Sequence, residues 1–138
     1  MHRFVLSIAV LTAAASTVQS AAGGEPHGPP FAFGGNAPQG AYVVMIGRDG
    51  SVHASGDGGL TRAAAHVTPG QLVALDRRAA RAHFGNLPAH TRCSGATKNT
   101  TTWIQIGSKK VAVAGTCMDA YQQLWKAFVA ATHFFMSG

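Results

Sequence analysis

After the first forty residues, the chain shows an apolar run that is followed by a turn and a second short strand pattern. Residues 41–47 (AYVVMIG) are rich in β-branched and apolar side chains, which is typical of a central strand. Residues 48–50 (RDG) predict a turn, because glycine readily adopts the positive φ that tight turns need. Residues 51–55 then return, so this part of the chain is predicted to be a β-hairpin.

Apolar residues at helical spacing predict a first helix over residues 68–83. Thr68 can accept hydrogen bonds from the free N–H groups of the first turn, Pro69 suits that turn, and Gln71 can complete a capping box. The apolar face of this helix consists of Leu72, Leu75, Ala79 and Ala82. We expect the helix to fade near residues 84–85, and a polar loop to follow over residues 86–98.

A second hairpin and a second helix complete the pattern. Residues 101–106 alternate like a half-buried strand, residues 107–109 turn, and residues 110–114 return. Either Thr116 or Asp119 then caps a last helix. Its apolar face consists of Tyr121, Leu124, Trp125 and Phe128. The order of these elements predicts an α+β fold, with a four-stranded antiparallel sheet (ββαββα order) and two helices packed on one face.

The start of the chain has the features of a secretory signal peptide over residues 1–20. A basic residue stands at position 3, residues 4–15 are almost entirely apolar, and small or slim residues precede a cleavage site near Ser20 or Ala22. The apolar run is shorter than the roughly 20 residues that span a bilayer, and we expect no transmembrane segment in the mature chain. The protein is therefore expected to be secreted into the extracellular space.

Residues 21–40 (AAGGEPHGPPFAFGGNAPQG) are dominated by glycine and proline, which predicts a flexible arm. Phe31 and Phe33 are unusual in such a segment. Either they dock the arm on the domain, or the arm is a disordered tail and the two aromatic residues are incidental. The rest of the chain, residues 41–138, is of a size that forms a single α+β domain.

The chain has two cysteines, Cys93 and Cys117, and both belong to the predicted domain. An even number of cysteines in an exported protein favours a disulfide, and only one pairing is possible. Closing a loop of about 25 residues stabilises a fold by about 3 kcal/mol in the chain-entropy model. The alternatives are a reactive thiol or a metal site, although metal ligands usually stand closer together, as in C-x-x-C.

Four short segments of the second half form a recognisable set. They are residues 84–88 (FGNLP), 91–95 (TRCSG), 111–117 (VAVAGTC) and 124–128 (LWKAF). They resemble a class of small secreted single-disulfide proteins found mainly in actinobacteria, and the likeness extends over roughly residues 41–130. Members often carry a Pro-Asp pair after the first cysteine region, where this chain has KNT. The class has no assigned activity, so the resemblance implies architecture and export but carries over no functional residues.

Few residues of this chain suit acid–base, metal or cofactor chemistry. A glycosidase-type pair of carboxylates is not expected, because each acid after the arm has a structural role in a turn, a loop or a helix. These acids are Asp49, Asp57, Asp76 and Asp119. The chain has no G-x-S-x-G sequence, phosphate-binding loop or dinucleotide fingerprint. Six histidines follow the leader, none at the i, i+4 spacing of helix-borne zinc ligands: His27, His53, His66, His83, His90 and His133. We expect no catalytic residues, no bound metal and no cofactor.

The charge balance instead suggests binding. Eleven Lys and Arg residues against five acids give a formal net charge of +6, which favours anionic partners and also keeps a small secreted protein soluble. The possible binding surface consists of Trp103, Gln105, Arg77, Arg81, Lys109 and Lys110. Alternation puts Trp103 and Gln105 on one face of their strand and the neighbouring isoleucines on the other. If the isoleucines face the helices, Trp103 stands on the open face of the sheet. Otherwise the arm covers Trp103, or it belongs to the core.

These observations predict a secreted non-enzymatic binding or accessory protein. Its partner would be an exported protein or an anionic envelope polymer, and specific nucleic-acid binding is not expected. The alternative is a small secreted hydrolase whose site is assembled only in three dimensions. A cleft that joins His53 or His90 with an acid and a hydroxyl would be its sign. A purely charge-driven surface binder would lose its ligand steeply as salt rises.

Overall fold

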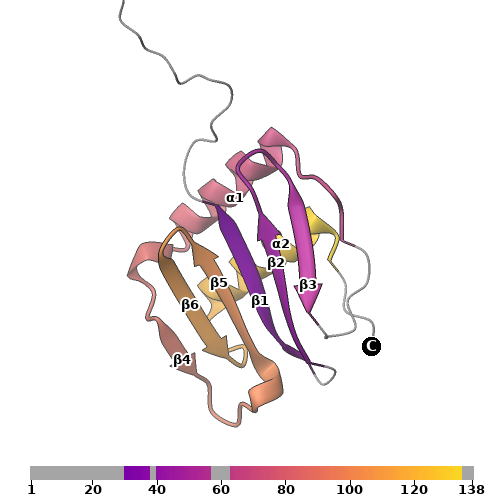
Figure 1. Cartoon of the computed structure of the whole chain (residues 1–138). Coiled ribbons are helices and arrows are strands. Elements are labelled where there is room, and N and C mark those ends of the chain that lie inside the picture. The colour runs from indigo at the N-terminus through magenta and orange to yellow at the C-terminus, as the bar shows by residue number, and fades with distance from the viewer. Residues whose placement is uncertain (1–29, 38–39, 57–62, 135–138) are drawn as a thin grey trace, which may run out of the picture.

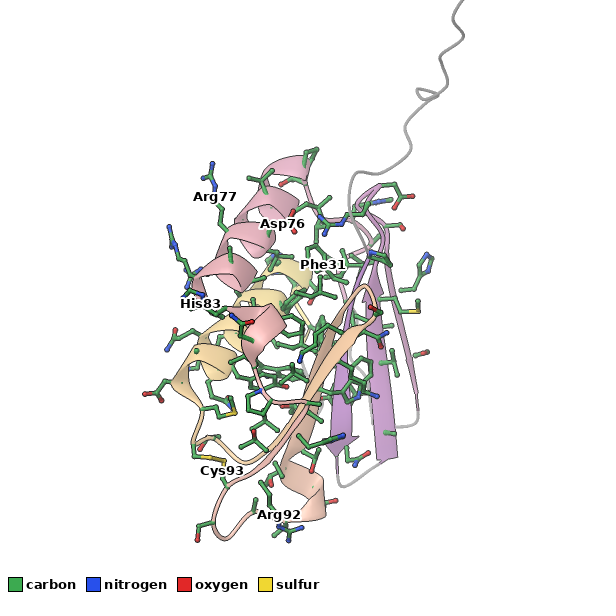
Figure 2. The ribbon with its side chains drawn as sticks, turned by 90° about the vertical axis from the view of Figure 1, so that its left-hand side faces the viewer. Phe31, Asp76, Arg77, His83, Arg92 and Cys93 are labelled. Atoms are coloured by element: carbon green, nitrogen blue, oxygen red, sulfur yellow. A yellow bond between two sulfur atoms is a disulfide. The ribbon has the colours of Figure 1, made fainter. Side chains whose placement is uncertain are left out.

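The computed structural model describes residues 30–37, 40–56 and 63–134. Within these residues, one six-stranded sheet is covered on one face by two helices, as Figures 1 and 2 show. The strands are β1 (Phe31–Ala37), β2 (Gly40–Ile46), β3 (Val52–Gly56), β4 (His90–Arg92), β5 (Thr101–Ile106) and β6 (Lys109–Ala114). The helices are α1 (Pro69–Arg81) and α2 (Asp119–Thr132), with the short 3-10 turns η2 (Phe84–Asn86) and η3 (Lys98–Thr100). The predicted signal peptide and residues 21–29 of the predicted arm lie outside the described residues.

The topology of the sheet corrects the four-stranded prediction. The strands follow the order β3-β2-β1-β5-β6-β4 across the sheet. Neighbouring strands are antiparallel except β4, which runs parallel to β6. The α+β class, both predicted hairpins (β2–β3 and β5–β6) and the placement of the two helices on one face are confirmed. The prediction of a four-stranded, fully antiparallel sheet is wrong, because β1 and β4 were not expected.

Strand β1 corrects the expectation of a flexible arm over residues 21–40 for the part of that segment that the structure describes, residues 31–37. It pairs with β2 on one side and with β5 on the other, so it is a central strand. Phe31 and Phe33 are fully buried, and their ring centroids lie 5.3 and 5.6 Å from that of Phe128 on α2. Burying two phenylalanines outweighs the weak strand preference of the glycines beside them. The predicted domain boundary at residue 41 is therefore too late.

Strand β4 lies within the segment that was expected to be a polar loop. Its three residues pair with β6, and two further backbone hydrogen bonds extend the contact. The N–H of Ala112 donates to the carbonyl of Ala89 (2.8 Å), and the N–H of Cys93 donates to the carbonyl of Ala114 (2.8 Å). The sequence of β4 has no strand pattern of its own. The strand therefore forms because the unpaired backbone groups at the edge of β6 are available to pair with it.

The N-terminus of α1 agrees with the sequence prediction, whereas that of α2 does not. In α1, Thr68 Oγ1 accepts the N–H of Gln71 (3.1 Å), and the N–H of Thr68 donates to Gln71 Oε1 (2.7 Å), which confirms the capping box. Helix α2 begins after Met118, whose side chain makes no capping hydrogen bond, so the prediction of Thr116 or Asp119 as the cap is wrong. Asp119 is the first helical residue, where the positive end of the helix dipole favours a carboxylate.

The core lies between the sheet and the helices. Its largest fully buried side chains include Phe31, Phe33, Val44, Ile46, Leu75, Ile104, Val111, Tyr121, Leu124 and Phe128. The Tyr121 hydroxyl is 2.8 Å from Thr102 Oγ1, and burial raises the pKa of Tyr121 far above its ordinary value. Among the described residues, no buried side-chain nitrogen or oxygen lacks a hydrogen-bond partner. The core is therefore apolar with its few polar groups satisfied.

The predicted disulfide is confirmed. Cys93 and Cys117 are bonded, with their Cα atoms 5.7 Å apart. The bond connects the segment after β4 to the residues just before α2, and the N–H of Cys117 donates to Cys93 Sγ (3.0 Å). The disulfide thus fixes the short edge strand to the start of the second helix.

Candidate functional site

The face of the sheet opposite the helices is not covered by any helix or strand in the described part of the chain (Figure 2). Phe33 and Ile104 point toward the helices, so strand alternation turns their neighbours to this face, which we call the open face. The open face includes Ala32, Gly34, Val43, Met45, His53, His90, Arg92, Trp103, Gln105, Lys110 and Ala112. Met45, 55% exposed, is its most accessible large apolar side chain.

Trp103 lies near the centre of the open face. Its strand neighbours in register are Gly34 on β1 and Ala112 on β6. A Cβ placed on Gly34 would stand only 2.8 Å from Trp103 Cζ2, so the indole lies directly against the Gly34 backbone. The Nζ atom of Lys110 stands 4.4 Å from the centroid of the indole ring, a cation–π contact. Trp103 is half-buried and is not covered by Phe31 or Phe33, which face the helices.

Among the described residues, the open face carries positive and neutral side chains only. None of the six described strands contains an aspartate or a glutamate. Lys110 and Arg92 are exposed on this face, and His53 and His90 are exposed at its two edges. Arg92 Nη2 donates to the carbonyl of Ala96 (3.3 Å), which holds this guanidinium beside the edge strand. The summed potential over this face is therefore positive.

The acids that the structure describes lie elsewhere. Asp49 is in the β2–β3 turn, Asp76 is on α1 and Asp119 begins α2. Both carboxylate oxygens of Asp76 accept hydrogen bonds from Arg48, at 2.7 and 3.0 Å. The Arg48 side chain is only 7% exposed and its guanidinium carbon lies 4.2 Å from the centroid of the Phe31 ring. This ion pair fixes the turn to α1 and neutralises Asp76.

The predicted surface residues fall on two sides of the molecule. Trp103, Gln105 and Lys110 share the open face, and Gln105 is directly opposite Lys110 in register. Lys109 is directed to the other side of its strand, where Nζ donates to the carbonyl of Leu87 (2.8 Å). Arg77 and Arg81 lie on α1 in the helical layer, and Figure 2 shows Arg77 pointing away from the sheet.

Sequence reasoning missed Gly34 and Arg92 as members of the open face. Both lie on strands that were not predicted. For Gly34 a signal existed, because the two phenylalanines just before it, Phe31 and Phe33, are spaced at the period of a strand. For Arg92 no local signal existed, since β4 is three residues long and depends on β6.

The two histidines considered for a hydrolase site, His53 and His90, are far apart in the described part of the chain. His53 and His90 lie on β3 and β4, the opposite edges of the sheet. Asp49, Ser51 and His66 do meet, since Ser51 and His66 form a β-bridge. However, the N–H and hydroxyl of Ser51 both donate to Asp49 Oδ1 (3.0 and 2.7 Å), and these hydrogen bonds hold the pKa of Asp49 below its ordinary value. The Asp49 carboxylate thus orients Ser51 and not the His66 imidazole. In a catalytic triad the acid orients the histidine, so this arrangement is a turn motif and not a triad.

Within the described residues, no three His, Cys, Asp or Glu side chains are grouped closely enough to hold a metal ion. Of the helices in these same residues, neither has the length and apolar character that crossing a membrane requires.

No protein-family model, curated protein sequence or solved structure matches this chain. The resemblance to secreted actinobacterial proteins stays a prediction. The open face is therefore interpreted from its own residues.

We expect Gly34→Ala to displace Trp103 and to lower the free energy of unfolding by about 1–3 kcal/mol. The added Cβ would press against the carbonyl oxygen of Tyr42, which is backbone and cannot move aside, and would stand 2.8 Å from Trp103 Cζ2. Urea unfolding measures the loss, and acrylamide quenching in a Trp125→Phe background measures the exposure of Trp103.

Gly85→Ala is the matched control, because a Cβ on Gly85 meets nothing within 4 Å. It should be neutral or slightly stabilising. Equal effects of the two substitutions would show that Trp103 does not depend on Gly34.

Proposed function

We propose that this chain is a secreted, non-enzymatic binding protein that holds an anionic polymer across the open face of its sheet. The observation that supports this proposal most is the composition of that face. It combines an aromatic ring with a lysine over it, an arginine and two histidines, and none of the described strands contains an acid. Export, predicted from the leader, would bring the protein to envelope polymers.

The shape of the open face suits an extended ligand better than a compact one. Strands are spaced about 4.8 Å apart, so six strands present a surface roughly 24 Å wide. Lys110, His90 and Arg92 lie on the β6–β4 side, whereas on the other side Val43 and Met45 of β2 are apolar and His53 stands at the β3 edge. A chain of repeated negative charges would lie over the β6–β4 side of the open face, where these three basic side chains stand.

The contact between Lys110 and Trp103 gives the site a mechanism. An exposed cation–π contact contributes only about 0.5–1 kcal/mol, so a negatively charged group can attract the ammonium away from the ring. Lys110 would then pair with the anion, and the indole ring would become free to contact an apolar face of the polymer. Lys110 would thus recognise the negative charge of the polymer, and Trp103 would recognise its apolar face.

The test compares two charge reversals in the same protein. Lys110→Glu changes the open face, whereas Lys126→Glu makes the same change on α2 in the opposite layer, and both lysines are exposed. We expect Lys110→Glu to weaken the binding of polyphosphate about tenfold and to lower the salt dependence of the affinity, because one phosphate contact is lost. Lys126→Glu should change the affinity by less than about twofold, since it leaves the contacts intact.

Isothermal titration calorimetry over a range of salt concentrations measures these affinities, with neutral dextran as the uncharged polymer. Equal losses from the two reversals would show that net charge alone attracts the polymer. Binding of dextran as tight as that of polyphosphate, or no binding of polyphosphate at low salt, would contradict the proposal.

A further inference from the structure

The outer surface of the helical layer has a groove between α1 and α2. Two hollows, of about 260 and 240 Å³, lie along the junction of these helices. Each is lined by residues of both helices, and Arg78 lines both hollows, so they meet at this residue. Alanines supply much of the lining: Ala74, Ala82, Ala120, Ala127, Ala130 and Ala131. This groove is on the side of the molecule away from the open face.

The dimensions of the groove suit a helix. On its α1 side the lining runs from Gln71 to Ala82, the residue that caps the end of α1, which at 1.5 Å per residue is roughly 17 Å, or about three helical turns. The distance between packed helices depends on the side chains at their contact, and small side chains such as alanine allow a close approach. A third helix could therefore lie along the groove with its backbone near both walls.

The charge of the groove determines which helix would bind. Arg78 and Arg81 line it and are exposed, and no acid is among the described lining residues. The nearby Asp76 is bound to Arg48, and Asp119 lies at the start of α2. Both arginines stand in the last turn of α1, where the helix dipole favours cations. The dipole explains their place on α1, but the hollow beside them has no acid to balance them.

We infer that this groove binds an acidic amphipathic helix of a partner protein. Such a helix would place small apolar residues against the alanines and carboxylates beside Arg78 and Arg81, where bidentate pairs with guanidinium groups can form. A flat membrane would touch only the crests of α1 and α2. A second copy of this chain would bring further positive charge to an already positive surface. An acidic helix fits both the shape and the positive charge of the groove.

Three substitutions test this inference, with a fluorescent helical peptide of alanine, leucine and glutamate as the probe. Arg78→Glu should weaken its binding at least about tenfold, because like charges then face each other across the groove. Arg77→Glu is the matched control. It makes the same charge change one residue earlier, but Arg77 does not line the groove, and we expect a change of less than about threefold. Ala130→Phe should also weaken binding about tenfold, because it fills the first hollow without changing the charge.

Fluorescence anisotropy measures these affinities, and circular dichroism checks that each exposed-site variant is folded. The same peptide with lysine in place of glutamate should not bind. Equal losses from Arg77→Glu and Arg78→Glu, unchanged binding by Ala130→Phe, or binding of the lysine peptide would each overturn the inference. Polyphosphate binding by the Ala130→Phe variant reports the open face separately, so this inference and the proposed function can fail independently.

Discussion

Phe33→Ala should lower the free energy of unfolding by about 3–5 kcal/mol, the range for truncating a fully buried phenylalanine. Phe33 has no exposed surface, and its ring contacts those of Trp125, Phe128 and Phe134 at centroid distances of 5.3, 5.6 and 5.9 Å. The truncation would leave a cavity between β1 and α2. A small domain has a total stability of only about 5–15 kcal/mol, so this is a large fraction of it. Guanidinium unfolding monitored by circular dichroism measures the change.

Asn36→Ala is the control for this prediction, because Asn36 lies on the same strand but is exposed. It should change the stability by less than about 0.5 kcal/mol. The pair also decides between the two interpretations of this segment. If residues 31–37 were a flexible arm, Phe33→Ala would be as mild as Asn36→Ala, and the central position of β1 would be contradicted.

Removing the disulfide should have the second-largest effect. Replacing both Cys93 and Cys117 with alanine should lower the stability by about 3 kcal/mol, because the bond closes a loop with a sequence separation of 24 residues and so restricts the unfolded chain. The short strand β4 should also become less protected, since the disulfide fixes the segment after it to α2. Urea unfolding measures the first effect, and amide hydrogen exchange at residues 90–92 measures the second.

Two comparisons support the interpretation of this experiment. The unmodified chain treated with a reductant should lose about as much stability as the double variant, and Ser94→Ala, next to Cys93 and exposed, should lose almost none. A double variant that unfolds at the same urea concentration as the oxidised chain would show that the disulfide has no stabilising role.

The elements that follow from local sequence are the ones that could be predicted. Helix α1 was found because Thr68 and Gln71 form their capping box within four residues. The β2–β3 turn was found because Gly50, with φ of 88°, adopts a conformation that favours glycine. The disulfide could be predicted from the number of cysteines alone, because two cysteines allow only one pairing. Each of these predictions rests on neighbours in the chain.

The elements that were missed depend on distant partners. The glycines of β1 predict flexibility, yet a side chain at Gly34 would not fit, because the Tyr42 backbone and the Trp103 ring lie against this residue. Strand β4 exists because β6 pairs with it. For the site, alternation separated Trp103 from the isoleucines of its strand, and its contact with Lys110 lies within the predicted β5–β6 hairpin. Its contact with Gly34 instead follows from the strand order, which places β1 beside β5. That order is a tertiary property, which one sequence does not specify.

The most direct test of the central claim follows Trp103 itself while a polyanion binds. The chain has two tryptophans, so Trp125→Phe leaves Trp103 as the sole reporter, and Trp103→Phe leaves Trp125 in the helical layer. On titration with polyphosphate, we predict that Trp103 emission changes and that acrylamide quenches it less, because Lys110 leaves the ring and the polymer covers it. Trp125 emission should stay constant. Binding that leaves Trp103 unchanged, or that changes Trp125 instead, would contradict the assignment of the open face as the binding site.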